Sequence, residues 1–197
     1  MTGIDKGQPW GLPGELPKSA PVAHTDAQVV SLRELQHGVI GVDEGDLART
    51  LGIRKPYDRT TPKHLVPVDA ICVELNGRSL VAVAHVVIGR FMVSPSVTAI
   101  MNAAFVGTRN LAPRAHPGDG LADVVSMNLS LADRYKARGR MSTGSHLPHP
   151  GIKITRAKTG EVSFERPRTV MVDGVPAGRA RTVRYEIVPA FVTIAVS

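Results

Sequence analysis

From Pro67 to the end of the chain, apolar and polar residues alternate with a period of two, the pattern of β-strands that bury one face. Two such runs, 70–75 and 79–87, flank Asn76-Gly77, the dipeptide most typical of a two-residue hairpin turn. Further strands are expected at 97–106, 122–127, 151–157, 161–164, 169–173, 182–188 and 191–196. So many strands separated by turns predict a mainly β fold, an antiparallel β-sandwich.

Helical signals are confined to three segments, which we expect to span 25–36, 45–52 and 130–138. The first and third begin with capping boxes, at 25–28 and 130–133, in which a hydroxyl side chain and a residue three positions later cap each other's backbone. The second ends at a glycine, which favours the left-handed conformation that closes helices.

The first 23 residues are rich in glycine and proline, so they should form an extended arm. Its Trp10 would anchor the arm within the molecule or dimer, which we favour, or dock it on a partner. We therefore divide the chain into an arm at 1–23, a small α/β portion at 24–65 and a β-sandwich domain at 66–197. A short buried strand is expected at 39–42.

The chain carries 24 lysines and arginines against 17 acidic residues, a net charge of +7. This balance favours phosphate-bearing partners, although solvated outer strand faces would account for most of the cations. Aromatic residues make up only 4% of the sequence, which disfavours a nucleic-acid stacking platform. No apolar run is long enough to span a membrane and no export signal is present, so we expect a cytoplasmic protein.

A motif in the run 101–124 places Asn-x-x-x-x-Gly before Pro-x-Ala and then Asp-Gly-Leu-x-Asp-Val. It resembles the carboxy-terminal half of the diacylglycerol kinase, sphingosine kinase and NAD kinase superfamily. A second segment, Asp46–Ile53, is similar to the Asp-Leu-Ala-Arg-Thr-Leu-Gly-Ile stretch of bacterial diacylglycerol and lipid kinases. The resemblance covers roughly 38–197 and implies a lipid-kinase β-sandwich with a truncated remnant of the nucleotide domain.

The sequence departs from these kinases where they hold nucleotide. Their Gly-Gly-Asp-Gly-Thr loop has no counterpart in this sequence. Where the family has Gly-Thr-Gly-Asn before the segment that matches Asp46–Ile53, this sequence has Val42, Asp43, Glu44 and Gly45. We expect Asp43 and Glu44 to cap the helix that includes Asp46 and to repel a triphosphate.

A third departure lies in a late strand, where the family's Asp-Gly-Glu triplet provides a catalytic glutamate. Here it reads Asp173-Gly174-Val175, so the base is absent and the first two residues should form simply a hairpin turn. His85 stands near the position of a cleft-facing asparagine in related kinases, and we expect it to be a core histidine with its hydrogen bonds satisfied.

The resemblance also implies a metal site. In bacterial lipid kinases a structural Mg²⁺ lies on an Asp-Gly turn, and the matching ligands here are Asp119 with the carbonyls of His116 and Leu121. An ordinary turn capped by Asp119 is the alternative, and no other cofactor is expected.

The family's Gly-x-His turn matches Gly144-Ser-His146. His146 with Arg138, Arg140 and Lys153 could form a phosphate-binding rim, or these residues could belong to a solvated loop.

Three functions remain open. The leading hypothesis is a catalytically inactive lipid-kinase-like protein that binds an acidic lipid, a phosphorylated small molecule or a partner protein through the surviving cleft. The first alternative is a divergent ATP-dependent lipid or small-molecule kinase completed by another subunit. The second is a structural homodimer without a ligand, formed by pairing of exposed sheet edges.

Overall fold

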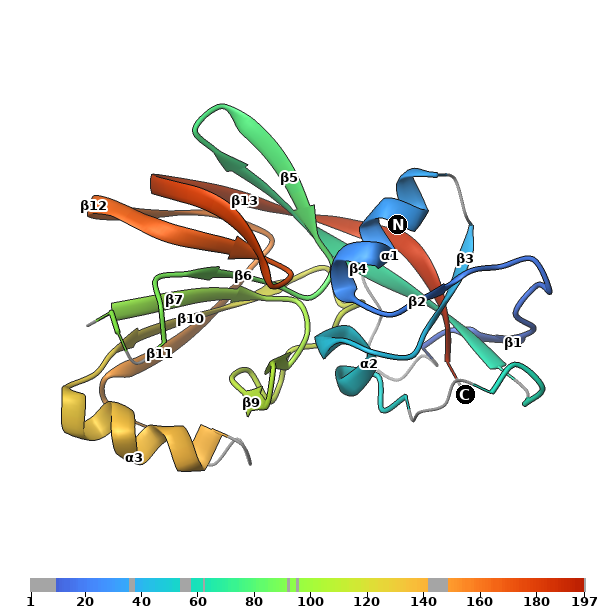
Figure 1. The fold of residues 1–197 in the computed structure, drawn as a ribbon, viewed down its shortest axis with the longest axis horizontal. Helices are drawn as coiled ribbons and strands as arrows, with labels where there is room; N and C mark the ends of the chain where they lie inside the picture. The colour runs from blue at the N-terminus through green and yellow to red at the C-terminus, as the bar shows by residue number, and fades with distance from the viewer. Residues whose placement is uncertain are drawn as a thin grey trace.

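The computed structural model describes residues 10–35, 38–53, 58–61, 63–91, 93–94, 96–141 and 149–196 (Figure 1). The strands are β1 (Leu12–Gly14), β2 (Val22–Ala23), β3 (Val39–Val42), β4 (Lys63–Leu75), β5 (Arg78–Ala82), β6 (His85–Ile88), β7 (Ser96–Met101), β8 (Phe105–Val106), β9 (Arg109–Asn110), β10 (Ala122–Asn128), β11 (Ile152–Ala157), β12 (Thr159–Val172) and β13 (Val175–Val196). The helices are α1 (Asp26–Glu34), α2 (Asp46–Thr50) and α3 (Leu131–Met141). Within these described ranges, no helix is long and apolar enough to cross a membrane.

One large sheet runs in the order β1-β4-β13-β12-β6-β7-β10-β11, and its neighbouring strands are antiparallel. β5 pairs with β4, while β3 pairs in parallel with β13 and β2 in parallel with β3. The 22-residue β13 therefore pairs with three strands along its length, β12, β4 and β3. Figure 1 shows it running from its hairpin with β12 to the carboxy-terminal end beside β4. Its register with β4 shifts between Val188 and Val192, where Ala190 has a φ of 49°.

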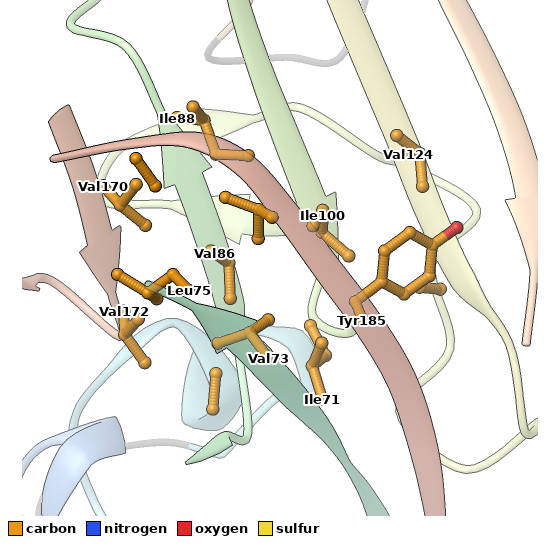
Figure 2. Packing of buried hydrophobic residues seen from close by; sticks show 14 of the residues in the cluster. Ile71, Val73, Leu75, Val86, Ile88, Ile100, Val124, Val170, Val172 and Tyr185 are labelled. Carbon is orange, nitrogen blue, oxygen red and sulfur yellow. The ribbon is translucent and has the colours of Figure 1, made fainter. Parts of the chain in front are cut away.

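The main core lies between the inner faces of this curled sheet. Figure 2 shows side chains that fill it, and the members of this core come from seven strands, β4, β5, β6, β7, β10, β12 and β13. The labelled members are Ile71, Val73, Leu75, Val86, Ile88, Ile100, Val124, Val170, Val172 and Tyr185. Strands from both ends of the sheet order thus share one apolar interior, which confirms the predicted antiparallel β-sandwich.

The hairpin and the hydroxyl half of each capping box are confirmed, whereas the Gln28 side chain accepts the amide of His24 rather than that of Thr25, and Asp133 accepts the Ser130 hydroxyl. Asn76 and Gly77 link β4 to β5 with φ angles of 51° and 74°, as a primed two-residue turn requires. The Thr25 hydroxyl accepts a hydrogen bond from the Gln28 amide at 3.2 Å and opens α1. Ser130 does the same for Asp133 at the start of α3.

Strand boundaries differ from the prediction in two ways. The expected strand at 79–87 is broken at Val83 and Ala84, which separate β5 from β6, and the expected strand at 97–106 is broken at 102–104, which separate β7 from β8. By contrast, the expected pairs of short strands at 161–164 with 169–173, and at 182–188 with 191–196, are continuous as β12 and β13, because register shifts absorb the irregular residues without ending the strands.

The arm packs within the molecule over residues 10–23. Its β1 adds to the edge of β4, and the Trp10 indole Nε1 donates a hydrogen bond to the Pro67 carbonyl at 3.0 Å. The indole ring also lies against the His116 imidazole, with ring centroids 4.4 Å apart. Trp10 is therefore the anchor that the sequence predicted, and residues 1–9 lie outside the described part of the chain.

A Trp10→Phe variant is expected to lower the free energy of unfolding by about 1 kcal/mol, because phenylalanine keeps an aromatic ring but leaves the Pro67 carbonyl without its donor. Urea denaturation would measure the change. Tyr135→Phe is the matched control, because Tyr135 is exposed and the hydroxyl that this variant removes faces solvent. Equal stability of the Trp10 variant and the wild type would contradict an anchoring role for the indole hydrogen bond.

Candidate functional site

Four titratable side chains from distant parts of the chain gather where α1, α2, β6 and the β12–β13 turn meet. They are Asp26, Asp46, His85 and Asp173, and we call them the acid–histidine cluster. Asp26, His85 and Asp173 are only 6%, 3% and 8% exposed. The side chain of Asp46 retains 15% exposure, so it forms the solvent side of the cluster.

Asp26 holds the amino-terminal end of α2. Its carboxylate accepts hydrogen bonds from the backbone amides of Asp46 at 2.8 Å and Leu47 at 3.0 Å. Gly45 is the N-cap residue and provides no side-chain oxygen, so the cap comes from the first turn of α1.

The prediction that Asp43 and Glu44 cap α2 is wrong for these two amides. The Asp43 carboxylate instead pairs with the His24 imidazole, whose Nδ1 lies 2.9 Å from Asp43 Oδ1. Asp43 directly follows β3, three residues before α2 begins. At that point its carboxylate lies beside His24, just before the start of α1, and not at the start of α2.

Asp46 joins α2 to β6. Its Oδ2 lies 2.9 Å from His85 Nε2 and also accepts the Gly107 amide at 2.9 Å. Burial by itself would raise the pKa of Asp46, but the hydrogen bonds from His85 and Gly107 outweigh it and the pKa is lowered.

His85 is buried, as predicted, but it is not fully satisfied. Among the described residues, its Nδ1 has no hydrogen-bond partner. Burial acts to lower the pKa of His85, and the hydrogen bond with Asp46 together with the negative charges of Asp173, Asp46 and Asp26 raises it overall.

Burial is also the main cause that raises the pKa of Asp26 to about 6, assisted by the nearby charge of Asp173.

Asp173 does more than form a hairpin turn. It and Gly174 do connect β12 to β13, with φ angles of 46° and 78°, as the sequence predicted. In addition, the Asp173 carboxylate accepts hydrogen bonds from three consecutive backbone amides, those of Val83 at 2.7 Å, Ala84 at 3.0 Å and His85 at 2.9 Å. Asp173 therefore holds the break between β5 and β6 and fixes the start of the strand that carries His85.

Asn102, the first polar residue of the 101–124 motif, supports the same region. Its Nδ2 donates to the carbonyls of Asp69 at 2.9 Å and Val83 at 2.8 Å, and the residue has no exposed surface. The Asp69 carboxylate in turn accepts the amides of Gly120 and Ala190. These motif residues tie loops together, which is a structural role.

A groove of about 340 Å³ lies beside the cluster, between α1, β5 and the β12–β13 hairpin. Its lining consists of Ala27, Val30, Glu34, Arg78, Ser79, Leu80, Val81, Val172, Asp173, Val175, Pro176 and Ala177. Most of these side chains are apolar, and the charged ones are Arg78 and two acids, Glu34 and Asp173. We call this the α1–β5 groove.

The residues predicted to bind Mg²⁺ form a turn that is closed by an ion pair. Asp119 Oδ1 accepts the Leu121 amide at 3.0 Å, and Oδ2 pairs with the Arg156 guanidinium, which also lies 3.5 Å from Asp123 Oδ1. The positive charge that a metal ion would bring is thus supplied by Arg156. This donor set does not fit a Mg²⁺ ion unless Arg156 moves, and the magnesium assignment stays a prediction.

The predicted phosphate rim is only partly within the described residues. His146 lies outside them, as does the side chain of Arg138. Arg140 is exposed on α3 and Lys153 is exposed on β11. Neither lines the α1–β5 groove, and Figure 1 shows α3 at the far end of the molecule from α1, so the rim would be a separate site.

Sequence reasoning located Asp46 and Gly45 through the kinase-like segment but missed Asp26. The only signal in the sequence is the position of Asp26 in the first turn of a predicted helix. An acid is common at that position and needs no distant partner, so the signal is weak. The sequence could not indicate that this acid reaches a second helix 20 residues later.

The strand order and the shared apolar core define an antiparallel β-sandwich protein. The chain belongs to the family of the YegS C-terminal NAD kinase beta-sandwich-like domain, whose profile matches residues 68–196. A comparison with curated protein sequences gave no match.

Two of the solved structures with the same fold come from Bacillus anthracis str. Sterne. The crystal structure of a provisionally assigned diacylglycerol kinase superimposes with a TM-score of 0.62 at 14% identity, covering 81% of this chain and 69% of that one. The crystal structure of a diacylglycerol kinase gives a TM-score of 0.57 at 14% identity, over 81% and 67% of the two chains. At this identity the likeness establishes the fold alone.

Proposed function

We propose that this protein is a catalytically inactive member of its family that binds an acidic lipid in the α1–β5 groove. The observation that carries the proposal is the position of Asp26. Its carboxylate occupies the first two amides of α2, directly after the segment that corresponds to the Gly-Thr-Gly-Asn of the resembling kinases. A nucleotide phosphate would have to displace a buried carboxylate there, against the repulsion of Asp46 and Asp173.

The apolar side chains of the groove and its Arg78 offer contacts to an amphipathic anion. Leu80, Val30 and Pro176 are among the apolar residues that could contact an acyl chain, while exposed Arg78 offers a charge-assisted hydrogen bond to a phosphate. The volume of about 340 Å³ lies within the usual range for ligand pockets. Glu34 lies at the end of α1, so the proposal places the phosphate on the β5 side, with Arg78.

Isothermal titration with short-chain phosphatidic acid, kept below its micelle concentration, tests the proposal. We expect saturable binding, and we expect Arg78→Glu to weaken it by about tenfold because reversing the charge removes one attraction and adds one repulsion. Short-chain diacylglycerol, which lacks the phosphate, should bind more weakly than phosphatidic acid.

The matched control is Arg114→Glu, which makes the same change in net charge at an exposed arginine outside the groove. Equal losses in the two variants would show attraction by the overall positive charge and would contradict binding in the groove. ATP with Mg²⁺ should neither bind nor be consumed in the presence of diacylglycerol, and ATP-dependent phosphorylation would contradict the inactive assignment.

A further inference from the structure

Three members of the acid–histidine cluster are close enough to hold one ion. Each of Asp26, Asp46 and His85 offers one ligand atom, and these three atoms all lie within 4.8 Å of one another. Zn²⁺ binds carboxylate oxygens and imidazole nitrogens at about 2.0–2.2 Å in tetrahedral geometry, so two ligand atoms of one ion lie about 3.3–3.6 Å apart. Side-chain shifts of about 1 Å would bring the three atoms to that separation.

The burial of the carboxylates also favours a cation. Asp173 is a third acid of the cluster, and Asp26 and Asp173 are only 6% and 8% exposed. Buried carboxylates are unfavourable as ions unless they are paired or coordinate a metal ion.

His85 is the nitrogen donor of the set. It is only 3% exposed, and its Nε2 is the ring nitrogen that faces the carboxylates, 2.9 Å from Asp46 Oδ2. Nε2 is therefore the nitrogen that would bind the ion, in place of its hydrogen bond with Asp46.

We propose that Asp26, Asp46 and His85 form a binding site for one first-row divalent transition-metal ion. Imidazole with two carboxylates suits Zn²⁺ or Mn²⁺, whereas Mg²⁺ prefers oxygen ligands alone. Asp46 is the partly exposed member, so it provides the entry side and the position of a water ligand. The ion would join α1, α2 and β6, which meet at these side chains, and the site is independent of the proposed lipid groove.

The test uses the full chain after removal of bound metal with EDTA. Isothermal titration with Zn²⁺ and with Mn²⁺ should give saturable binding of one ion per chain, and Mg²⁺ should bind much more weakly. At an ion concentration 100-fold above the dissociation constant, the melting temperature should rise by about 5–10 °C. Absence of saturable Zn²⁺ and Mn²⁺ binding up to about millimolar concentration would overturn the proposal.

The decisive variant is Asp46→Asn, which keeps the shape of the side chain and should weaken metal binding by at least tenfold. Asp43→Asn is the matched control, because Asp43 also contacts a histidine, but on the surface and without a second carboxylate in the set. Unchanged affinity in Asp46→Asn would overturn the site. Loss of binding in Asp119→Asn alone would place the ion at the Asp119 turn and would also overturn it.

A spectroscopic measurement on the wild type keeps the test valid if the variant fails to fold. Pulsed electron paramagnetic resonance of bound Mn²⁺ should show a ¹⁴N coupling from an imidazole ligand. A spectrum with oxygen ligands only would exclude His85 and contradict the proposed donor set.

Discussion

Replacing Asp173 with alanine is expected to lower the free energy of unfolding by about 3–5 kcal/mol, one of the two largest effects we expect from a single substitution in this protein. The carboxylate accepts three backbone amides, from Val83, Ala84 and His85, at distances of 2.7–3.0 Å. Asp173 is 8% exposed, so water cannot easily replace all three bonds. In Asp173→Ala the carboxylate acceptor is lost, so the three backbone amides are left in the interior without a hydrogen-bond partner. Chemical denaturation with guanidinium measures the loss.

Two further variants separate the hydrogen bonds from other effects of removing Asp173. Asp173→Asn tolerates the positive φ of 46° and keeps one acceptor oxygen, so its loss should be about half as large. Glu161→Ala removes a carboxylate from an exposed pair with Arg184 at 2.8 Å and should change stability little, because water screens an exposed ion pair. If Asp173→Ala costs no more than Glu161→Ala, the three amides are not a stabilising feature.

Local signals in the sequence predicted the turns and strands well. Asn76-Gly77 and Asp173-Gly174 both form two-residue hairpins because their left-handed conformations are specified by the two residues themselves. The alternation of apolar residues likewise fixed which face of each strand enters the core shown in Figure 2.

The contacts that build the cluster could not be predicted in the same way. Asp173 binds amides that are 88–90 residues away in the sequence, and Asp26 binds amides 20 and 21 residues away. In both cases an ordinary local role, as a turn residue or as a helix-start acid, explains the residue type completely. Only the tertiary arrangement shows that the same carboxylates have a second set of partners.

The break in the predicted strand at 79–87 has the same origin. Val83 and Ala84 are apolar and continue the alternating pattern, so sequence alone favours one strand. In the structure their amides turn to the Asp173 carboxylate and the Ala84 carbonyl accepts the amides of Asn102 and Ala103. The interruption therefore depends on two loops that reach this point from the 101–124 motif and from the β12–β13 turn.

A Gly45→Ala variant is expected to lower the free energy of unfolding by about 2–4 kcal/mol, for two reasons that add. Gly45 has a φ of 109°, a conformation that alanine adopts only with strain. A methyl group there would also lie 2.8 Å from Asp26 Cγ and so displace the carboxylate that caps α2. Thermal and chemical denaturation would both report the loss.

Gly52→Ala provides the matched control, because Gly52 also has a positive φ, 72°, but an added Cβ would meet no atom within 4 Å. It should cost only about 1 kcal/mol, the strain of the backbone alone. The difference between the two variants then measures the contact between Gly45 and Asp26. If both glycines cost the same, Asp26 moves aside freely, and the amides at the start of α2 are accessible to another anion. That result would remove the main support for an inactive nucleotide site.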